Sequence, residues 1–195
     1  MNKNNMMTRS ITSFTADDDY KISGRPVVCG QITDMGGYLE VIEEGALAHT
    51  DISNICLLEN HKLDMIPYAR YRQGDTNSTM NIYVDRTGMS FDASLDKENP
   101  RAQEAHSGIK RGDIDKMSFC FWIDWDTAEW DESGEKPLLR IKNITKILEI
   151  SIVNWPAYDG TSVGISRDEN GTDLLTVYKQ MKQNEQLAIE KARLL

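Results

Sequence analysis

Residues 117–124 read Met-Ser-Phe-Cys-Phe-Trp-Ile-Asp, and a large apolar side chain occupies every second position. Met117, Phe119, Phe121 and Ile123 fall on one face of this stretch, and Ser118, Cys120 and Trp122 fall on the other. A period of two residues is that of a β-strand, in which successive side chains point to opposite faces. The stretch therefore predicts a strand with one apolar face and a second, less apolar face that presents Ser118.

Further strands are predicted on both sides of this one. They cover residues 27–32, 38–42, 55–58, 80–85, 89–95, 138–141 and 147–153, which are short apolar or alternating stretches between turn-forming residues. In the last of them, Leu148, Ile150 and Ile152 are expected on one face, and Glu149 and Ser151 on the other. We predict a β-rich α+β fold: a mostly antiparallel, barrel-like sheet of six or seven strands with one internal helix and a helical C-terminal tail.

The internal helix is predicted from its two ends. Asn99 followed by Pro100 is typical of an N-cap and first helical residue, apolar residues recur at helical spacing, and Gly112 ends the pattern. A second helical pattern begins at Thr172. We expect a flexible N-terminal tail over 1–15, one folded domain over 16–168, and a helical, scaffold-like or docking tail over 169–195.

Composition excludes several classes of function. The chain has 31 acidic and 22 basic residues, a net charge of -9, and no basic cluster longer than Lys110-Arg111, which argues against nucleic-acid binding. Three widely spaced cysteines do not suggest a disulfide framework or a CxxC metal site, and a reducing cytoplasm fits them. The first ten residues lack an apolar signal-peptide core, and no apolar stretch is long enough to span a membrane.

Nucleophilic catalysis by serine requires a nearby base, and the base requires a third group that orients it. The three histidines are the candidate bases. His61 follows a short apolar strand where it enters a loop, which is a favourable place for a catalytic side chain. His106 is expected on the helix surface and His49 in a loop. Three scattered histidines without an HExxH motif are too few for a catalytic metal site, so we expect no metal or cofactor.

Four segments resemble the phage prohead protease family, in the order of that family. They are residues 41–47 (VIEEGAL), 57–61 (LLENH), 109–121 (IKRGDIDKMSFCF) and 148–158 (LEISIVNWPAY). The third contains a glycine turn that leads into a Met-Ser-aromatic strand, and the second ends on His61. The resemblance extends over residues 26–163, and several ordered motifs in one β context make coincidence improbable.

The resemblance implies a fold and mechanism related to the herpesvirus assembly proteases. Ser118 would be the nucleophile, His61 its base, and Glu149 the residue that orients His61. The chain would be a serine endopeptidase that processes the major capsid protein and scaffold segments during prohead maturation, with self-cleavage. It would self-associate inside the assembling prohead, in the host cytoplasm, without nucleic-acid or membrane partners. The alternative is a non-enzymatic scaffold or assembly protein of the same fold.

Several residues near the expected site allow other interpretations. Ser151 shares the expected face of Glu149 and is a rival nucleophile, and Cys120 lies two residues from Ser118 and allows a Cys-His mechanism. Cys120 also departs from the small residue that the family usually has near this point. Glu149 could instead be a solvated carboxylate on an open sheet face.

Two other features have a functional and a structural interpretation. Arg140 and Arg167 could help to stabilise an oxyanion, but surface roles are the default for both. The acidic loop over 126–135, with Trp130 inside it and Trp125 before it, could be a flap over the substrate or a solvated connection with an aromatic anchor.

Overall fold

The computed structural model describes residues 6–11 and 14–154 and, near the C-terminus, residues 176, 179, 180, 182–184, 186 and 187. Within this part of the chain, no helix is both long and apolar enough to cross a membrane.

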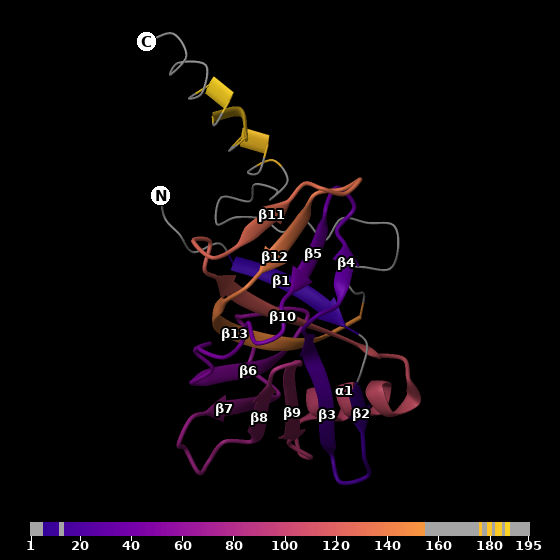
Figure 1. The fold of residues 1–195 in the computed structure, drawn as a ribbon. Helices are drawn as coiled ribbons and strands as arrows, with labels where there is room; N and C mark the ends of the chain where they lie inside the picture. The colour runs from indigo at the N-terminus through magenta and orange to yellow at the C-terminus, as the bar shows by residue number, and fades with distance from the viewer. Residues whose placement is uncertain are drawn as a thin grey trace.

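A five-stranded sheet crosses the middle of the molecule (Figure 1). Its strands, in spatial order, are β1 (Met6–Ile11), β10 (Lys116–Ile123), β13 (Ile144–Val153), β6 (Asn54–Glu59) and β7 (Ala69–Arg72). The pairs are antiparallel except for β13 and β6, which run parallel. Sequence patterning did not predict β1, which places β10 in the interior of the sheet.

Two four-stranded sheets lie on either side of it in Figure 1. One contains β11 (Glu129–Asp131), β12 (Leu138–Ile141), β5 (Leu39–Ile42) and β4 (Ile32–Asp34). The other contains β2 (Phe14–Ala16), β3 (Lys21–Val28), β9 (Gly88–Ser94) and β8 (Met80–Asp85). Buried side chains from all three sheets form one core, in which the Phe119 and Phe121 rings stack 4.7 Å apart.

The prediction of a single barrel-like sheet was wrong, because the described residues form three sheets and no closed barrel. Residues 27–32, expected as one strand, show the reason. Gly30 adopts the left-handed conformation, with φ of 79°, and separates β3 from β4, which belong to different sheets. Several other strands have only three or four residues, too few to show a clear alternation.

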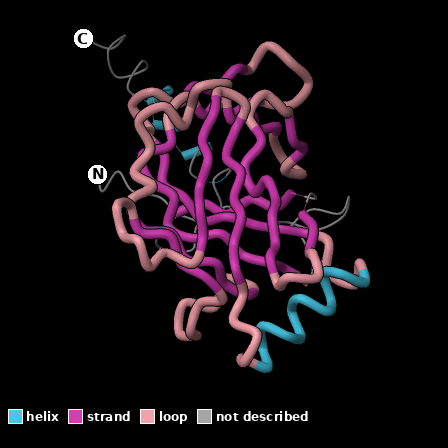
Figure 2. The backbone as a smooth tube through the Cα atoms, turned by 90° about the horizontal axis from the view of Figure 1, so that it is seen from below, coloured by secondary structure: helices cyan, strands magenta, loops and turns pink. Residues whose placement is uncertain are grey.

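Helix α1 (Pro100–Arg111) confirms the predicted internal helix. The Asn99 side chain accepts a hydrogen bond from the Arg101 backbone N–H, and Gly112 ends the helix in the left-handed conformation. Figure 2 shows α1 as a single helix outside the strands at one end of the molecule. The predicted helical tail over 169–195 is not shown, since most of it lies outside the described residues.

The expected surface position of His106 was wrong. Only 5% of this residue is exposed, its Nε2 contacts the Asp17 carbonyl oxygen at 2.5 Å, and its ring stacks on Tyr20 at 4.2 Å. The segment before β3 covers this side of α1, a long-range contact that helical periodicity cannot reveal. His106 is therefore a structural histidine.

Candidate active site

Ser118 lies in β10, between β1 and β13, where its side chain is buried. The antiparallel register pairs Ser118 with Ser151 and Cys120 with Glu149. Paired residues on neighbouring strands project from the same face of a sheet. One face of the β10–β13 pair therefore groups four polar or sulfur-containing side chains, while Phe119 and Ile150 occupy the apolar face.

Strand β13, which carries Glu149, contains a β-bulge. Cys120 pairs with Glu149 but the next residue, Phe121, pairs with Ile147, so Leu148 is an extra residue in β13. The expected alternation of Leu148 with Ile150 is therefore interrupted, and Ile147 takes the buried position opposite Phe121. The bulge lets β13 keep apolar residues in the core on both sides of Glu149.

His61 reaches this face by a tight turn at the end of β6. Asn60 donates its backbone N–H to the Ile152 carbonyl oxygen at 2.9 Å, and the Lys62 N–H to the Glu59 carbonyl oxygen at 3.0 Å. Asn60 and His61 both have left-handed backbones, with φ of 47° and 59°. That conformation costs a residue with a Cβ roughly 1–2 kcal/mol, and asparagine tolerates it best. The turn reverses the chain and brings the imidazole to Ser118.

The three side chains form one chain of hydrogen bonds. The His61 Nε2 atom lies 2.8 Å from the Ser118 Oγ atom, and the Nδ1 atom lies 2.6 Å from the Glu149 Oε1 atom. The Glu149 side chain is 2% exposed, which rules out a solvated carboxylate on an open sheet face, whereas the His61 side chain is 32% exposed. A buried carboxylate needs such a partner, because an unpaired buried charge is strongly unfavourable.

Ser151 is a fourth member of this network. Its hydroxyl donates a hydrogen bond to the Glu149 Oε2 atom and accepts one from the His61 backbone N–H at 3.1 Å. The His61 Nε2 atom is hydrogen-bonded to the Ser118 hydroxyl, whereas Ser151 contacts the backbone N–H of His61. Sequence reasoning considered Ser151 only as a nucleophile, because the contacts of a strand serine are not visible in a periodic pattern.

Cys120 has the wrong environment for a thiolate nucleophile. Burial, together with the smaller effect of the nearby Glu149 carboxylate, raises the pKa of its thiol to about 12. The thiol is therefore protonated at neutral pH, and it packs as a small apolar side chain.

Replacing Cys120 with alanine should leave kcat/KM within about threefold of the unchanged protein and lower stability by about 1 kcal/mol, because only packing is lost. Kinetic assays and denaturant unfolding measure the two effects, with the half-buried Cys56→Ala as the matched control. A loss of activity of a thousandfold or more would instead assign the nucleophile to Cys120.

The other predicted candidates lie elsewhere. His49 is exposed in a turn, Arg140 pairs with Glu43 and Asp131, and Arg167 lies outside the described residues. Trp125 and Trp130 pack against the core, as expected of an aromatic anchor. No group of three or more potential metal ligands occurs among the residues that the structure describes.

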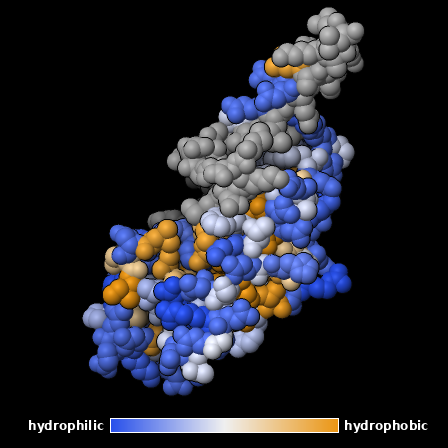
Figure 3. All heavy atoms as spheres, turned by 90° about the vertical axis from the view of Figure 1, so that its left-hand side faces the viewer, coloured by the Kyte–Doolittle hydropathy of each residue, from blue (hydrophilic) through white to orange (hydrophobic). Residues whose placement is uncertain are grey.

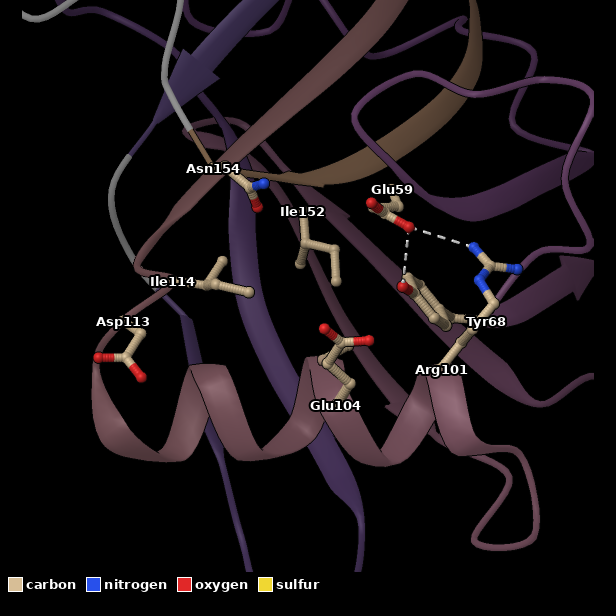
Figure 4. Close-up of a pocket in the computed structure, with 9 residues that line it drawn as sticks. Glu59, Tyr68, Arg101, Glu104, Asp113, Ile114, Ile152 and Asn154 are labelled. Atoms are coloured by element: carbon tan, nitrogen blue, oxygen red, sulfur yellow. Dashed lines mark hydrogen bonds and ion pairs between the residues drawn. The ribbon is translucent and has the colours of Figure 1, made fainter.

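A polar cavity of about 320 Å³ lies beside the His61 turn and next to α1 (Figure 4). Ile152 lines it, so it opens on the face of β13 opposite Ser151 and is separate from the Ser118 face. The Glu59 carboxylate beside it contacts Lys62 at 2.9 Å, Arg101 at 3.2 Å and Tyr68 at 3.3 Å. The hydrogen bond from Lys62 is the main reason that the pKa of Glu59 is lowered. These contacts tie the turn that carries His61 to α1.

The chain was compared with known protein families, curated proteins and solved structures. The family described as caudovirus prohead serine protease matches residues 5–173, which include Ser118, His61 and Glu149. No curated protein and no solved structure shows significant similarity to the chain.

Proposed function

This chain belongs to the caudovirus prohead serine protease family, and we propose from that membership that Ser118, His61 and Glu149 are its catalytic residues. The observation that carries the proposal is the continuous hydrogen-bonded chain from the Ser118 Oγ atom through His61 to Glu149. A nucleophile, a base and a group that orients the base are the three functions that acyl transfer by serine requires.

The geometry suggests the following steps. The His61 Nε2 atom accepts the Ser118 proton as Oγ attacks the carbonyl carbon of the scissile bond. Glu149 holds the Nδ1–H of the imidazole and stabilises the imidazolium that forms. The imidazolium then gives its proton to the leaving amine, which departs and leaves an acyl group on Ser118. Water, activated by His61, hydrolyses that ester and restores the serine.

Family membership also indicates the setting: capsid-related substrates within the assembling prohead of an infected host cell. We propose more specifically that the substrates are the major capsid protein and scaffold segments, and that the enzyme cleaves itself. The net charge of -9 makes nucleic acid an unsuitable partner.

A fluorophosphonate probe tests the proposal without knowledge of the cleavage site, because it reacts with an activated serine whatever the substrate sequence. The full chain should be labelled, and peptide mapping should place the label on Ser118. A non-enzymatic scaffold of the same fold would remain unlabelled. Label on Ser151 would reject the assignment of the nucleophile.

Replacing Glu149 with glutamine should reduce kcat by about 10⁴-fold, less than removal of the nucleophile or base. The amide keeps the shape of the side chain but lacks the charge that stabilises the imidazolium. Steady-state kinetics on a cleaved peptide measure the loss, and Glu104→Gln at the polar cavity is the control. Activity within tenfold of the unchanged protein would mean that Glu149 does not orient His61.

A further inference from the structure

We propose that Ser151 is a positioning residue that keeps the catalytic base and its carboxylate hydrogen-bonded to each other. This inference rests on the proposed function. Its hydroxyl contacts both: it donates to the Glu149 Oε2 atom and accepts from the His61 backbone N–H at 3.1 Å. One buried oxygen therefore links the turn after β6, which carries the base, to β13, which carries the orienting group.

Each contact restricts a motion that would disturb the base. The Glu149 carboxylate uses one oxygen for the His61 Nδ1 atom and the other for Ser151, which prevents rotation of the carboxylate away from the imidazole. The backbone of His61 is in a left-handed conformation, and the contact from its N–H to Ser151 helps to hold the turn in place. Groups that orient a metal-ligating histidine contribute about 10–100-fold, and we expect an effect of similar size on this histidine.

The same contacts argue against Ser151 as a nucleophile. Its proton is directed to Glu149, and the two ring nitrogens of His61 already contact Ser118 and Glu149. Ser118 and Ser151 lie directly opposite each other on neighbouring strands. Their positions in the sheet therefore do not distinguish their roles, but their contacts with His61 do.

The test compares Ser151→Ala with Ser151→Thr in the full chain. The alanine variant should lower kcat and the rate of fluorophosphonate labelling of Ser118 by about 10–100-fold, with KM within about twofold. Threonine keeps the hydroxyl and should recover most of the rate. Combining Ser151→Ala with Glu149→Gln should add little to the loss from Glu149→Gln alone, because Ser151 acts through that carboxylate.

Three results would overturn the proposal: an unchanged labelling rate in Ser151→Ala, losses that multiply in the double variant, or a loss in Ser151→Ala that appears in KM alone. If Ser151→Thr does not fold, the double variant of Ser151→Ala with Glu149→Gln still tests the proposal. Failure of the unchanged protein to label at Ser118 would instead reject the proposed function, so the two failures are distinguishable.

The loop that follows His61 has a different property, an unusual concentration of exposed apolar side chains. Leu63 is 73% exposed, Met65 39% and Ile66 78%. Figure 3 shows exposed apolar groups on the side of the molecule where β6 and β7 lie in Figure 1. Exposed apolar groups that form a contiguous patch often mark a binding surface.

Contacts within the protein hold this loop in place. The Met65 N–H donates to the Lys62 carbonyl oxygen at 3.3 Å, and the Arg101 guanidinium contacts the Ile66 carbonyl oxygen at 3.4 Å and Glu59 at 3.2 Å. The loop therefore presents its apolar side chains to solvent on a supported backbone and does not bury them in the core.

We infer that Leu63 and Ile66 bind apolar side chains of the substrate polypeptide near the scissile bond. Ile66 lies five residues after His61, a span of at most about 18 Å, and an extended substrate of five or six residues has the same reach. A polypeptide held for attack by Ser118 must lie against His61, and can continue onto the residues that follow it.

The test uses Leu63→Ser/Ile66→Ser with quenched peptide pools that carry leucine or serine on either side of the cleaved bond. The double variant should raise KM about tenfold for the leucine pools only, with kcat and fluorophosphonate labelling unchanged. Ile32→Ser, at an exposed position on β4, is the matched control. An equal change in KM for both pools would overturn the inference. A change in oligomeric state without a change in KM would also overturn it, because it would assign the loop to contact between copies.

Discussion

Replacing Ser118 with alanine should abolish proteolysis, reducing kcat by about 10⁶-fold. The variant keeps the oriented imidazole but has no atom that can form the acyl-enzyme, and Cys120 cannot substitute because its thiol is protonated at neutral pH. Co-expression of Ser118→Ala with the capsid protein, followed by gel electrophoresis, should show only the uncleaved precursor. The same variant should not react with a fluorophosphonate.

Ser107→Ala, at an exposed position on α1, is the matched control and should process the precursor normally. Denaturant unfolding should show that Ser118→Ala remains folded, because the change removes one hydroxyl from a buried strand. Normal processing by a folded Ser118→Ala protein would reject Ser118 as the nucleophile.

Replacing His61 should cause a loss of similar size, since without a base the Ser118 hydroxyl is a weak nucleophile. The left-handed backbone at this position complicates a simple alanine variant, because alanine at φ near 59° is strained. His61→Asn is therefore the better test: asparagine tolerates this backbone conformation but cannot accept the proton. Both variants should be inactive, and the unfolding midpoint should be higher for asparagine than for alanine.

Combination with Ser118→Ala provides an independent check on His61. Residues that act as one catalytic unit show losses that do not multiply, so the double variant should be no slower than either single variant. His49→Ala, at an exposed turn, is the control and should retain full activity. A His61→Asn protein that stays folded and active would show that another group serves as the base.

Local structure was accessible from the sequence wherever the pattern was long enough. The alternation in residues 117–124 predicted β10, and the pair Asn99-Pro100 with Gly112 predicted α1 from end to end. The candidates Ser118, His61 and Glu149 followed from resemblance to a family, and their separation along the chain could not show that they meet. Residues 27–32 were apolar enough to suggest one strand, but Gly30 divides them between two sheets.

The sequence by itself determined the strands with a long alternating pattern, such as β10, where α1 begins and ends, and which side chains could carry acyl-transfer chemistry. Those properties depend on near neighbours along the chain. Only the tertiary structure decided that parallel pairing of β6 with β13 brings His61 to Glu149, 88 positions away, and that Ser151 joins them. The physical reason is that strand pairing, bulges and buried hydrogen bonds depend on partners distant in sequence, which a local period of two cannot specify.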